Sequence, residues 1–434
     1  GVLAQARSAF ERCVPMSRSA GGAYRSGAGV GEACPDSEAP HKHVGLPGSL
    51  FEMEGANPPL RKSATFVVGH TVGAQHGDRT EAERIEAYEF FGVGFALAKA
   101  LAQHDRDVAV RVFILDNSGS TCECDGHVLQ RIGDNGYYKS EPSSRWEEIR
   151  SMALDQARWN DRVGVRSEFY LVNPPCPEEL VEGRDFAVID PAKGHGDAQV
   201  AALAQILERN GPRGPTPLVP RLKQLRASLR KRIPSGYRVM LSIVTDGLPT
   251  SGNYTKQDKD SQIHEQEKFI QELRDFANSF NSSLVIRLAT DEDDVVEFYN
   301  KIDQEVELPL DILDDIQGEA KEIHAAGNGW LTYTPMIHRI REGGTMLKLF
   351  DMLDERPFKP VEIAALLELL LQRRGDPPFP RDPKELLEVV AAAVERSPLV
   401  YDGRLHKMAK PVDLKLLKKA LGKKQGVAQA CSLM

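Results

Sequence analysis

The feature that most limits the fold of this chain is a long alternation of strand-like and helix-like segments between residues 80 and 316. The strand-like segments are short, apolar and rich in β-branched residues, and they lie at 108–116, 167–173, 184–190, 237–247, 283–291 and 308–316. Between them, apolar residues recur at helical spacing, as in 143–159, 198–211 and 218–233. This order is typical of a doubly wound, mostly parallel sheet with helices on both faces. The sequence therefore predicts an α/β fold.

The rest of the chain divides into segments of different composition. Residues 1–60 are rich in Gly, Ser, Ala and Pro, so they bury too little apolar surface to offset the entropy of ordering and are expected to be a disordered tail. We assign residues 61–325 to the α/β domain, including a helix before its first strand. Helical patterns alone, divided by Pro-rich turns, predict a C-terminal helical module over 345–425, and residues 426–434 are expected to be a tail.

Composition and charge exclude several classes of protein. A net charge of −8 argues against a nucleic-acid-binding protein. No apolar run reaches the roughly 18 residues that a membrane span needs. Six cysteines in 434 residues are too few for a disulfide scaffold, and this indicates a reducing, cytoplasmic location.

Side chains with oxygen atoms follow the ends of two predicted strands. The sequence DNSGS places Asp116, Ser118 and Ser120 after the first strand, and TDG places Asp246 after a later one. Thr216 stands in a Pro/Gly-rich loop before a helix. Ligands of doubly wound sheets bind outside the carboxyl ends of the strands, and Mg²⁺ prefers hard oxygen ligands. These five residues are therefore candidate ligands of Mg²⁺ or Mn²⁺.

The order of these five positions resembles the von Willebrand factor type A (VWA) domain, in which they form the metal-ion-dependent adhesion site (MIDAS). The resemblance covers roughly residues 105–320 and implies a VWA/Rossmann-like sheet. It implies that Ser118, Ser120 and Thr216 bind the metal directly, and that Asp116 and Asp246 act largely through bound waters. It further implies that an Asp or Glu of a partner protein completes the shell, so that capture requires a divalent metal.

Three functions are compatible with such a site. The favoured interpretation is a non-enzymatic binding module, loosely similar to the intracellular copines, although no lipid-binding C2 pattern is present. A metal-assisted hydrolase would need a base near the ion, for which His127 and His195 are the candidates. The chain lacks a zinc-protease helix motif, a phosphate-binding Gly-Lys loop and a nucleophile elbow. The third interpretation is a VWA subunit that works with a partner ATPase.

The last four residues, Cys431-Ser432-Leu433-Met434, match a prenylation box in which the terminal Met favours a farnesyl group on Cys431. One lipid chain binds a bilayer only marginally, and stable anchoring needs a second signal. A basic segment that is expected to be an amphipathic helix precedes the box and could bind an anionic membrane through Lys415, Lys418, Lys419, Lys423 and Lys424. The sequence thus predicts a protein held peripherally on the cytoplasmic face of a membrane; the alternative is a frayed basic helix end with a free thiol.

Overall fold

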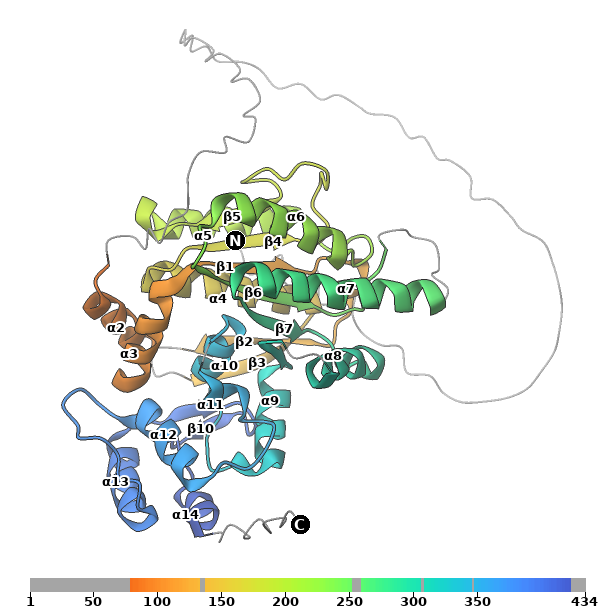
Figure 1. Ribbon diagram of the computed structural model, residues 1–434. Coiled ribbons are helices and arrows are strands. Elements are labelled where there is room, and N and C mark those ends of the chain that lie inside the picture. The colour runs from red at the N-terminus through yellow and green to blue at the C-terminus, as the bar shows by residue number, and fades with distance from the viewer. Residues whose placement is uncertain (1–78, 133–136, 252–258, 306–307, 346, 423–434) are drawn as a thin grey trace, which may run out of the picture. The chain divides into compact units, whose positions relative to one another are not determined.

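The computed structural model describes residues 79–132, 137–251, 259–305, 308–345 and 347–422. It contains a six-stranded sheet in the order β5-β4-β1-β6-β7-β8 (Figure 1). The strands are β1 (Val108–Leu115), β4 (Ser167–Leu171), β5 (Phe186–Ile189), β6 (Arg238–Thr245), β7 (Ser283–Leu288) and β8 (Leu310–Leu313). Neighbouring strands pair in parallel, except that β4 and β5 are antiparallel. The expected α/β fold with a mostly parallel sheet is confirmed.

Counted by their order along the chain, the strands of this sheet run 3-2-1-4-5-6, which is the order of a Rossmann-like doubly wound sheet. In this arrangement the chain leaves β1 toward one edge, returns, and continues from β6 toward the other edge. The point at which the direction reverses lies between β1 and β6. A crevice for ligands is expected there, at the carboxyl ends of the strands.

Helices cover both faces of the sheet because the strands turn alternate apolar side chains to each side. In β1, Val110, Val112 and Ile114 face one hydrophobic cluster, whereas Phe113 and Leu115 face another. The first cluster includes α6 (Leu218–Arg232), α7 (Lys259–Phe280) and α8 (Asp293–Glu305). The second includes α4 (Arg145–Val163) and α5 (Gly196–Arg209). Both sides of the strands are therefore buried, as their unbroken apolar runs indicate.

A third hydrophobic cluster joins helices from the two ends of the described chain. It contains α2 (Glu81–Phe90), α3 (Phe95–His104), α9 (Ile316–Ile323), α10 (Pro335–Glu342), α11 (Lys348–Asp351), α12 (Pro360–Leu371), α13 (Pro383–Arg396) and α14 (Leu414–Gly422). Gly94, just before α3, lies so close to α12 that a Cβ there would be 2.5 Å from the carbonyl oxygen of Leu370. The C-terminal helices thus share their core with the helices that precede β1.

Two antiparallel hairpins were not expected from the sequence. The first, β2 (Gly126–Ile132) and β3 (Tyr137–Ser143), lies between β1 and α4. The second, β9 (Val400–Asp402) and β10 (Lys407–Ala409), shows that the region after 345 is not purely helical, which corrects that expectation. The shorter helical elements are η1 (Asp105–Asp107), η2 (Gly119–Cys122), η3 (Pro191–Lys193) and a π-helical segment, η4 (His324–Asn328).

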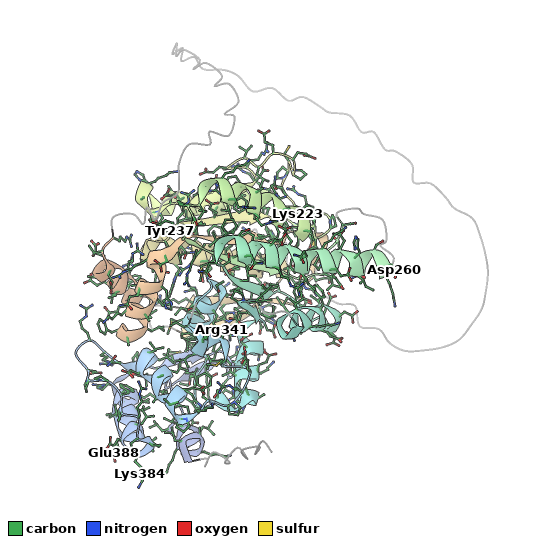
Figure 2. The ribbon with its side chains drawn as sticks, viewed as in Figure 1. Lys223, Tyr237, Asp260, Arg341, Lys384 and Glu388 are labelled. Carbon is green, nitrogen blue, oxygen red and sulfur yellow. The ribbon has the colours of Figure 1, made fainter. Side chains whose placement is uncertain are left out.

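Arg341 connects the sheet with the third cluster. Arg341 lies on α10, where Figure 2 labels it, and its side chain is fully buried. It forms ion pairs with the carboxylates of Asp311 on β8, Glu319 on α9 and Asp354 after α11. One cation thus neutralises acids from three segments that are distant in sequence.

Some of the expectations fall on residues that the structure does not describe. These are the N-terminal tail, Lys423, Lys424 and the C-terminal residues 426–434 with Cys431. Among the described residues, no helix is both long and apolar enough to cross a membrane.

Candidate metal centre

The structure brings the predicted oxygen side chains to one place, the carboxyl ends of β1 and β6, where the crevice is expected. Asp116 directly follows β1, and Asp246 directly follows β6. The two strands pair in parallel as neighbours, so their carboxyl ends lie together at the point where the winding reverses. The amide of Asp116 also donates to the carbonyl oxygen of Val244, at 2.9 Å, and extends the pairing to the edge of the site.

Three of the predicted oxygens form a small triangle. The hydroxyl oxygens of Ser118 and Ser120 are 3.1 Å apart. Both hydroxyls donate to Oδ1 of Asp246, at 3.3 Å from Ser118 and 3.0 Å from Ser120. Ser118 and Asp246 are buried, whereas Ser120 is exposed, so one corner of the triangle is open to solvent.

Asp116, beside this triangle in sequence, is fully buried and is hydrogen-bonded to the serine loop. Its Oδ1 accepts the amide of Ser118 at 2.8 Å, and its Oδ2 accepts the hydroxyl of Thr245 at 2.6 Å. Burial, with the negative charge of Asp246 added to it, raises the pKa of Asp116 to about 7. Burial also raises the pKa of Asp246. Two acids are therefore held together in a place that disfavours their charged forms.

Thr216 reaches the same crevice from the loop before α6. Its Oγ1 lies against Gly247, where a Cβ would be only 3.4 Å away from it. In the same loop, the carbonyl oxygen of Gly214 accepts a hydrogen bond from the amide of Gly119 at 2.9 Å. The backbone amide of Thr216 donates to the hydroxyl of Thr250 at 2.9 Å, which fixes the loop. All five predicted residues thus lie around the carboxyl ends of β1 and β6.

Asn117, which the sequence did not single out, joins the loops around this crevice. Its side-chain amide donates to the carbonyl oxygens of Asn173 and Asn210, at 3.1 and 3.2 Å. Its Oδ1 accepts the amide of Asn173 at 2.8 Å. The side chain of Asn173 in turn donates to the carbonyl oxygen of Pro215, beside Thr216, at 2.6 Å. The serine loop and the threonine loop are therefore connected through side-chain hydrogen bonds.

Arg145 is the most important site residue that the sequence did not reveal. It is the first residue of α4, it is buried, and its Nη1 lies 3.1 Å from Oδ2 of Asp246. Two of its nitrogens also bind the carboxylate of Asp125, each at 2.7 Å, and Nη1 pairs with Glu292 at 3.0 Å. No local pattern signals this residue, because its partner Asp246 lies 101 positions later.

The donor set fits a hard dication. It consists of two carboxylates and three hydroxyls, with no sulfur and no imidazole, as Mg²⁺ requires. Adjacent ligands of an octahedral Mg²⁺ are about 2.9 Å apart, given metal–oxygen distances of about 2.0–2.1 Å. The sides of the oxygen triangle, at 3.0, 3.1 and 3.3 Å, are close to one face of such an octahedron. A cation at this face would also offset the burial that raises the pKa of both aspartates.

Other groups with metal-binding or catalytic side chains are less suited to such a role. Within the described ranges, the only close group of His, Cys, Asp and Glu side chains is Glu319, Glu322 and Asp354, and Arg341 already pairs with two of these acids. His127 and His195, the candidate bases of a hydrolase, are both exposed. His127 belongs to β2, and its backbone amide donates to the carboxylate of Glu148 at 2.8 Å.

The basic helix α14 uses its apolar face inside the protein. Leu417 and Leu421 are buried in the third hydrophobic cluster, with residues of α13. Lys415, Lys418 and Lys419 stay exposed on the outside of the helix. In this structure an anionic surface therefore has access to the lysines but not to the buried leucines.

Fold and site together define an α/β protein with a cluster of oxygen-bearing side chains at the reversal point of a Rossmann-like sheet. No protein-family model matches the sequence, and no curated protein matches it either. Solved structures that match include two crystal structures of the pilus adhesin SpaC from Lactobacillus rhamnosus GG, one of them in an open conformation, with TM-scores of 0.31 and 0.30 and identities of 15% and 16%. The matches cover 47% and 48% of this chain but only 28% of the adhesin chain. A likeness of this size supports neither a family nor a function.

Proposed function

We propose that this chain is a VWA-type binding module that holds Mg²⁺ or Mn²⁺ at the crevice between β1 and β6 and captures a carboxylate of a partner protein. The observation that carries the proposal is the triangle of Ser118, Ser120 and Asp246 oxygens, whose sides match adjacent positions around an octahedral ion. The order of the five oxygen residues along the chain, which resembles the MIDAS of VWA domains, supports it as well.

The residues of the site have distinct tasks in this proposal. Ser118, Ser120 and Asp246 would hold the ion directly, with Thr216 facing it from the neighbouring loop; the resemblance implies instead that Thr216 binds directly and Asp246 acts through bound water. Asp116 orients the serine loop through its hydrogen bond with the amide of Ser118. When bound, the ion would supply a positive charge with a coordination position open to an anionic ligand.

The charges of the proposed ligands favour an anionic partner. Of the three residues in the oxygen triangle only Asp246 is charged, and Arg145, which also pairs with Asp125 and Glu292, offsets part of that charge. A dication held by these three oxygens would keep a net positive charge, and a carboxylate from a partner would offset it. Ser120, the exposed corner of the triangle, marks the side from which such a carboxylate can approach.

The first test is a calorimetric titration with Mg²⁺ of the wild-type chain and the Ser118→Ala variant. We expect the loss of one ligand hydroxyl to weaken Mg²⁺ binding by about tenfold or more. Ser228→Ala, on α6 and away from the crevice, is the matched control and should bind Mg²⁺ as the wild type does. Equal Mg²⁺ affinity in Ser118→Ala and the wild type would refute the metal site.

Carboxylate capture needs a separate measurement on the Mn²⁺-loaded chain. An Asp-containing peptide that takes a coordination position should displace metal-bound water and lower the water-proton relaxation enhancement, whereas the same peptide with Asn should not. A pull-down with and without EDTA then separates the alternatives. Metal-dependent partners that are mainly ATPases would favour the ATPase-subunit function, and metal-dependent turnover of a phosphoester that is lost in Asp116→Ala would favour the hydrolase.

A further inference from the structure

A second candidate site lies in the C-terminal part of the described chain, apart from the residues of the metal centre. It is a cavity of about 260 Å³ whose walls come from α9 and η4, the strand-like segment 331–333, the β9–β10 hairpin and the start of α14. A single ordered water needs only about 10–15 Å³ of such space, so the cavity has room for a small organic molecule.

The walls of this cavity are held by backbone and side-chain hydrogen bonds. The amide of Thr332 donates to the carbonyl oxygen of Pro411 at 3.0 Å, and its hydroxyl donates to that of Lys410 at 2.7 Å. The amide of Gly403 donates to the carbonyl oxygen of Tyr333 at 3.0 Å, and the amide of Asp413 donates to the carbonyl oxygen of Trp330 at 2.8 Å. The hairpin and the segment before α14 are therefore fixed against one central segment, and the cavity is part of the fold.

The cavity is lined by basic side chains. Arg404 and Lys407 belong to the β9–β10 hairpin, and within the described ranges neither side chain forms an ion pair or a hydrogen bond. Lys410 also lines it, but its ammonium group donates to the carbonyl oxygens of Val394, Glu395 and Ser397 at the end of α13. Arg404 and Lys407 are thus the two cations that are available to a ligand.

The two acids of the lining already accept hydrogen bonds from the backbone. Oδ1 of Asp402 accepts the amides of Arg404 and Leu405, at 2.9 and 3.1 Å. Oδ1 of Asp413 accepts the amides of Lys415 and Leu416, at 2.8 and 3.0 Å, at the start of α14. Three permanent cations then face two acids in the cavity, and the exposed lysines of α14 add further positive charge beside it. This region is basic in a chain whose net charge is −8.

From this arrangement we propose that the cavity binds a small molecule or a lipid headgroup that carries a phosphomonoester, with Arg404 and Lys407 as its ligands. A phosphomonoester has a charge of about −1.5 to −2 near neutral pH, which matches two unpaired cations. The guanidinium of Arg404 offers the planar pair of donors that phosphate oxygens accept, and Lys407 adds a mobile point charge. The inference does not depend on the metal centre.

The test uses the full chain in EDTA, so that no metal at the other site can hold phosphate. Soluble probes are inorganic phosphate and glycerol 3-phosphate, measured by ³¹P NMR titration. Membrane probes are phosphatidylcholine vesicles with phosphatidic acid, which carries a phosphomonoester, or with phosphatidylserine, which does not. We expect the phosphomonoester probes to bind and phosphatidylserine vesicles to bind more weakly. Binding of the soluble probes alone would identify a free ligand, and binding of the phosphatidic acid vesicles alone would identify a headgroup.

Two double variants show whether the cavity is responsible. Arg404→Gln with Lys407→Gln removes two charges from the cavity, and Lys418→Gln with Lys419→Gln removes two charges from the exposed face of α14. With the soluble probe glycerol 3-phosphate, we expect the first to weaken binding by at least about tenfold and the second by less than about threefold. Because none of the four side chains supports a described contact, both variants should keep the wild-type circular dichroism. Equal losses in the two variants, or no binding of any phosphomonoester probe to the wild type, would overturn the proposal.

Discussion

Arg145, which is distant in sequence from Asp246, sets much of the electrostatics of the candidate metal centre. Asp246 is buried, and burial raises its pKa, while its contact with Arg145 favours the ionised form. Arg145 is itself surrounded by carboxylates, because Asp125 and Glu292 bind it from the exposed side. The site therefore contains a network of charged side chains in which a metal ion and Arg145 would each neutralise part of the charge of Asp246.

This sharing leads to a prediction for Arg145→Ala. The substitution leaves Asp246 buried without its cation, so the free energy of unfolding in EDTA should fall by about 3 kcal/mol. Saturating Mg²⁺ should restore part of the loss, because the ion takes over the neutralisation. Denaturant titrations with and without Mg²⁺ measure both effects. Arg158→Ala, which removes an exposed ion pair with Asp155, should cost less than about 1 kcal/mol in either condition.

Two elements, β4 and α6, are connected through one buried carboxylate. Glu168 on β4 accepts both terminal nitrogens of Arg232, the last residue of α6, at 2.7 and 2.9 Å. Arg166 and the hydroxyl of Tyr170 bind the same carboxylate. Burial alone would raise the pKa of Glu168, but these partners, Arg232 first, lower it to about 2.

A pH-dependent stability follows from this lowered pKa. The carboxylate of Glu168 has a pKa near 4.5 when unfolded and about 2 when folded, so its contribution of about 3 kcal/mol is complete above pH 4.5 and is lost as the pH falls toward 2. The difference in free energy of unfolding between the wild type and Glu168→Gln should therefore shrink over this pH range. A difference that stays constant from pH 6 to pH 2 would contradict the assignment.

The strands of the sheet could be predicted from the sequence far better than the hairpins. The segment predicted at 108–116 is observed at Val108–Leu115, and that at 237–247 is observed at Arg238–Thr245, because strands buried on both faces leave unbroken apolar runs. The β2–β3 hairpin is largely polar and exposed, and it packs through contacts such as Tyr138 with Tyr401, whose ring centroids are 5.6 Å apart. Such a distant partner leaves no periodicity in the local sequence.

The antiparallel direction of β5 could not be predicted from the sequence either. Its residues are apolar and buried like those of its neighbours, yet it pairs with β4 in the antiparallel direction. Burial determines the composition of a strand, whereas its direction depends on the path of the connecting loop. Asp116, Ser118, Ser120 and Asp246 could be predicted because they follow strand ends, and Thr216 because its place in the order matches the VWA resemblance. Arg145 and Asn117 could not be predicted, since their roles depend only on tertiary contacts.

At the scale of the whole molecule, Arg341 connects the sheet to the helices after it. Asp311, Glu319 and Asp354 belong to three different segments, and all three depend on this one buried cation. Burial raises the pKa of Asp311 to about 6 even with the arginine present. The third hydrophobic cluster and this charge cluster therefore stabilise the same junction by different forces.

Arg341→Met tests the strength of that junction. Removing the cation leaves buried acids without a partner, so the free energy of unfolding should fall by about 3–5 kcal/mol. Arg381→Met removes an ion pair with Glu368 in which the arginine is exposed, and it should cost less than about 1 kcal/mol. Urea titrations of both variants give the comparison, and similar losses in the two would mean that Arg341 is not essential to the junction.

The hydrogen bonds that Asn117 and Asn173 make between the serine loop and the threonine loop have a kinetic consequence. With its coordinating loops held in place beforehand, the protein needs little rearrangement when an ion arrives. Mg²⁺ gives up its hydration shell reluctantly. If the proposed site binds Mg²⁺, the slow step of binding would then be the departure of water from the ion. An ion that dehydrates faster would bind sooner, even where it binds no more tightly.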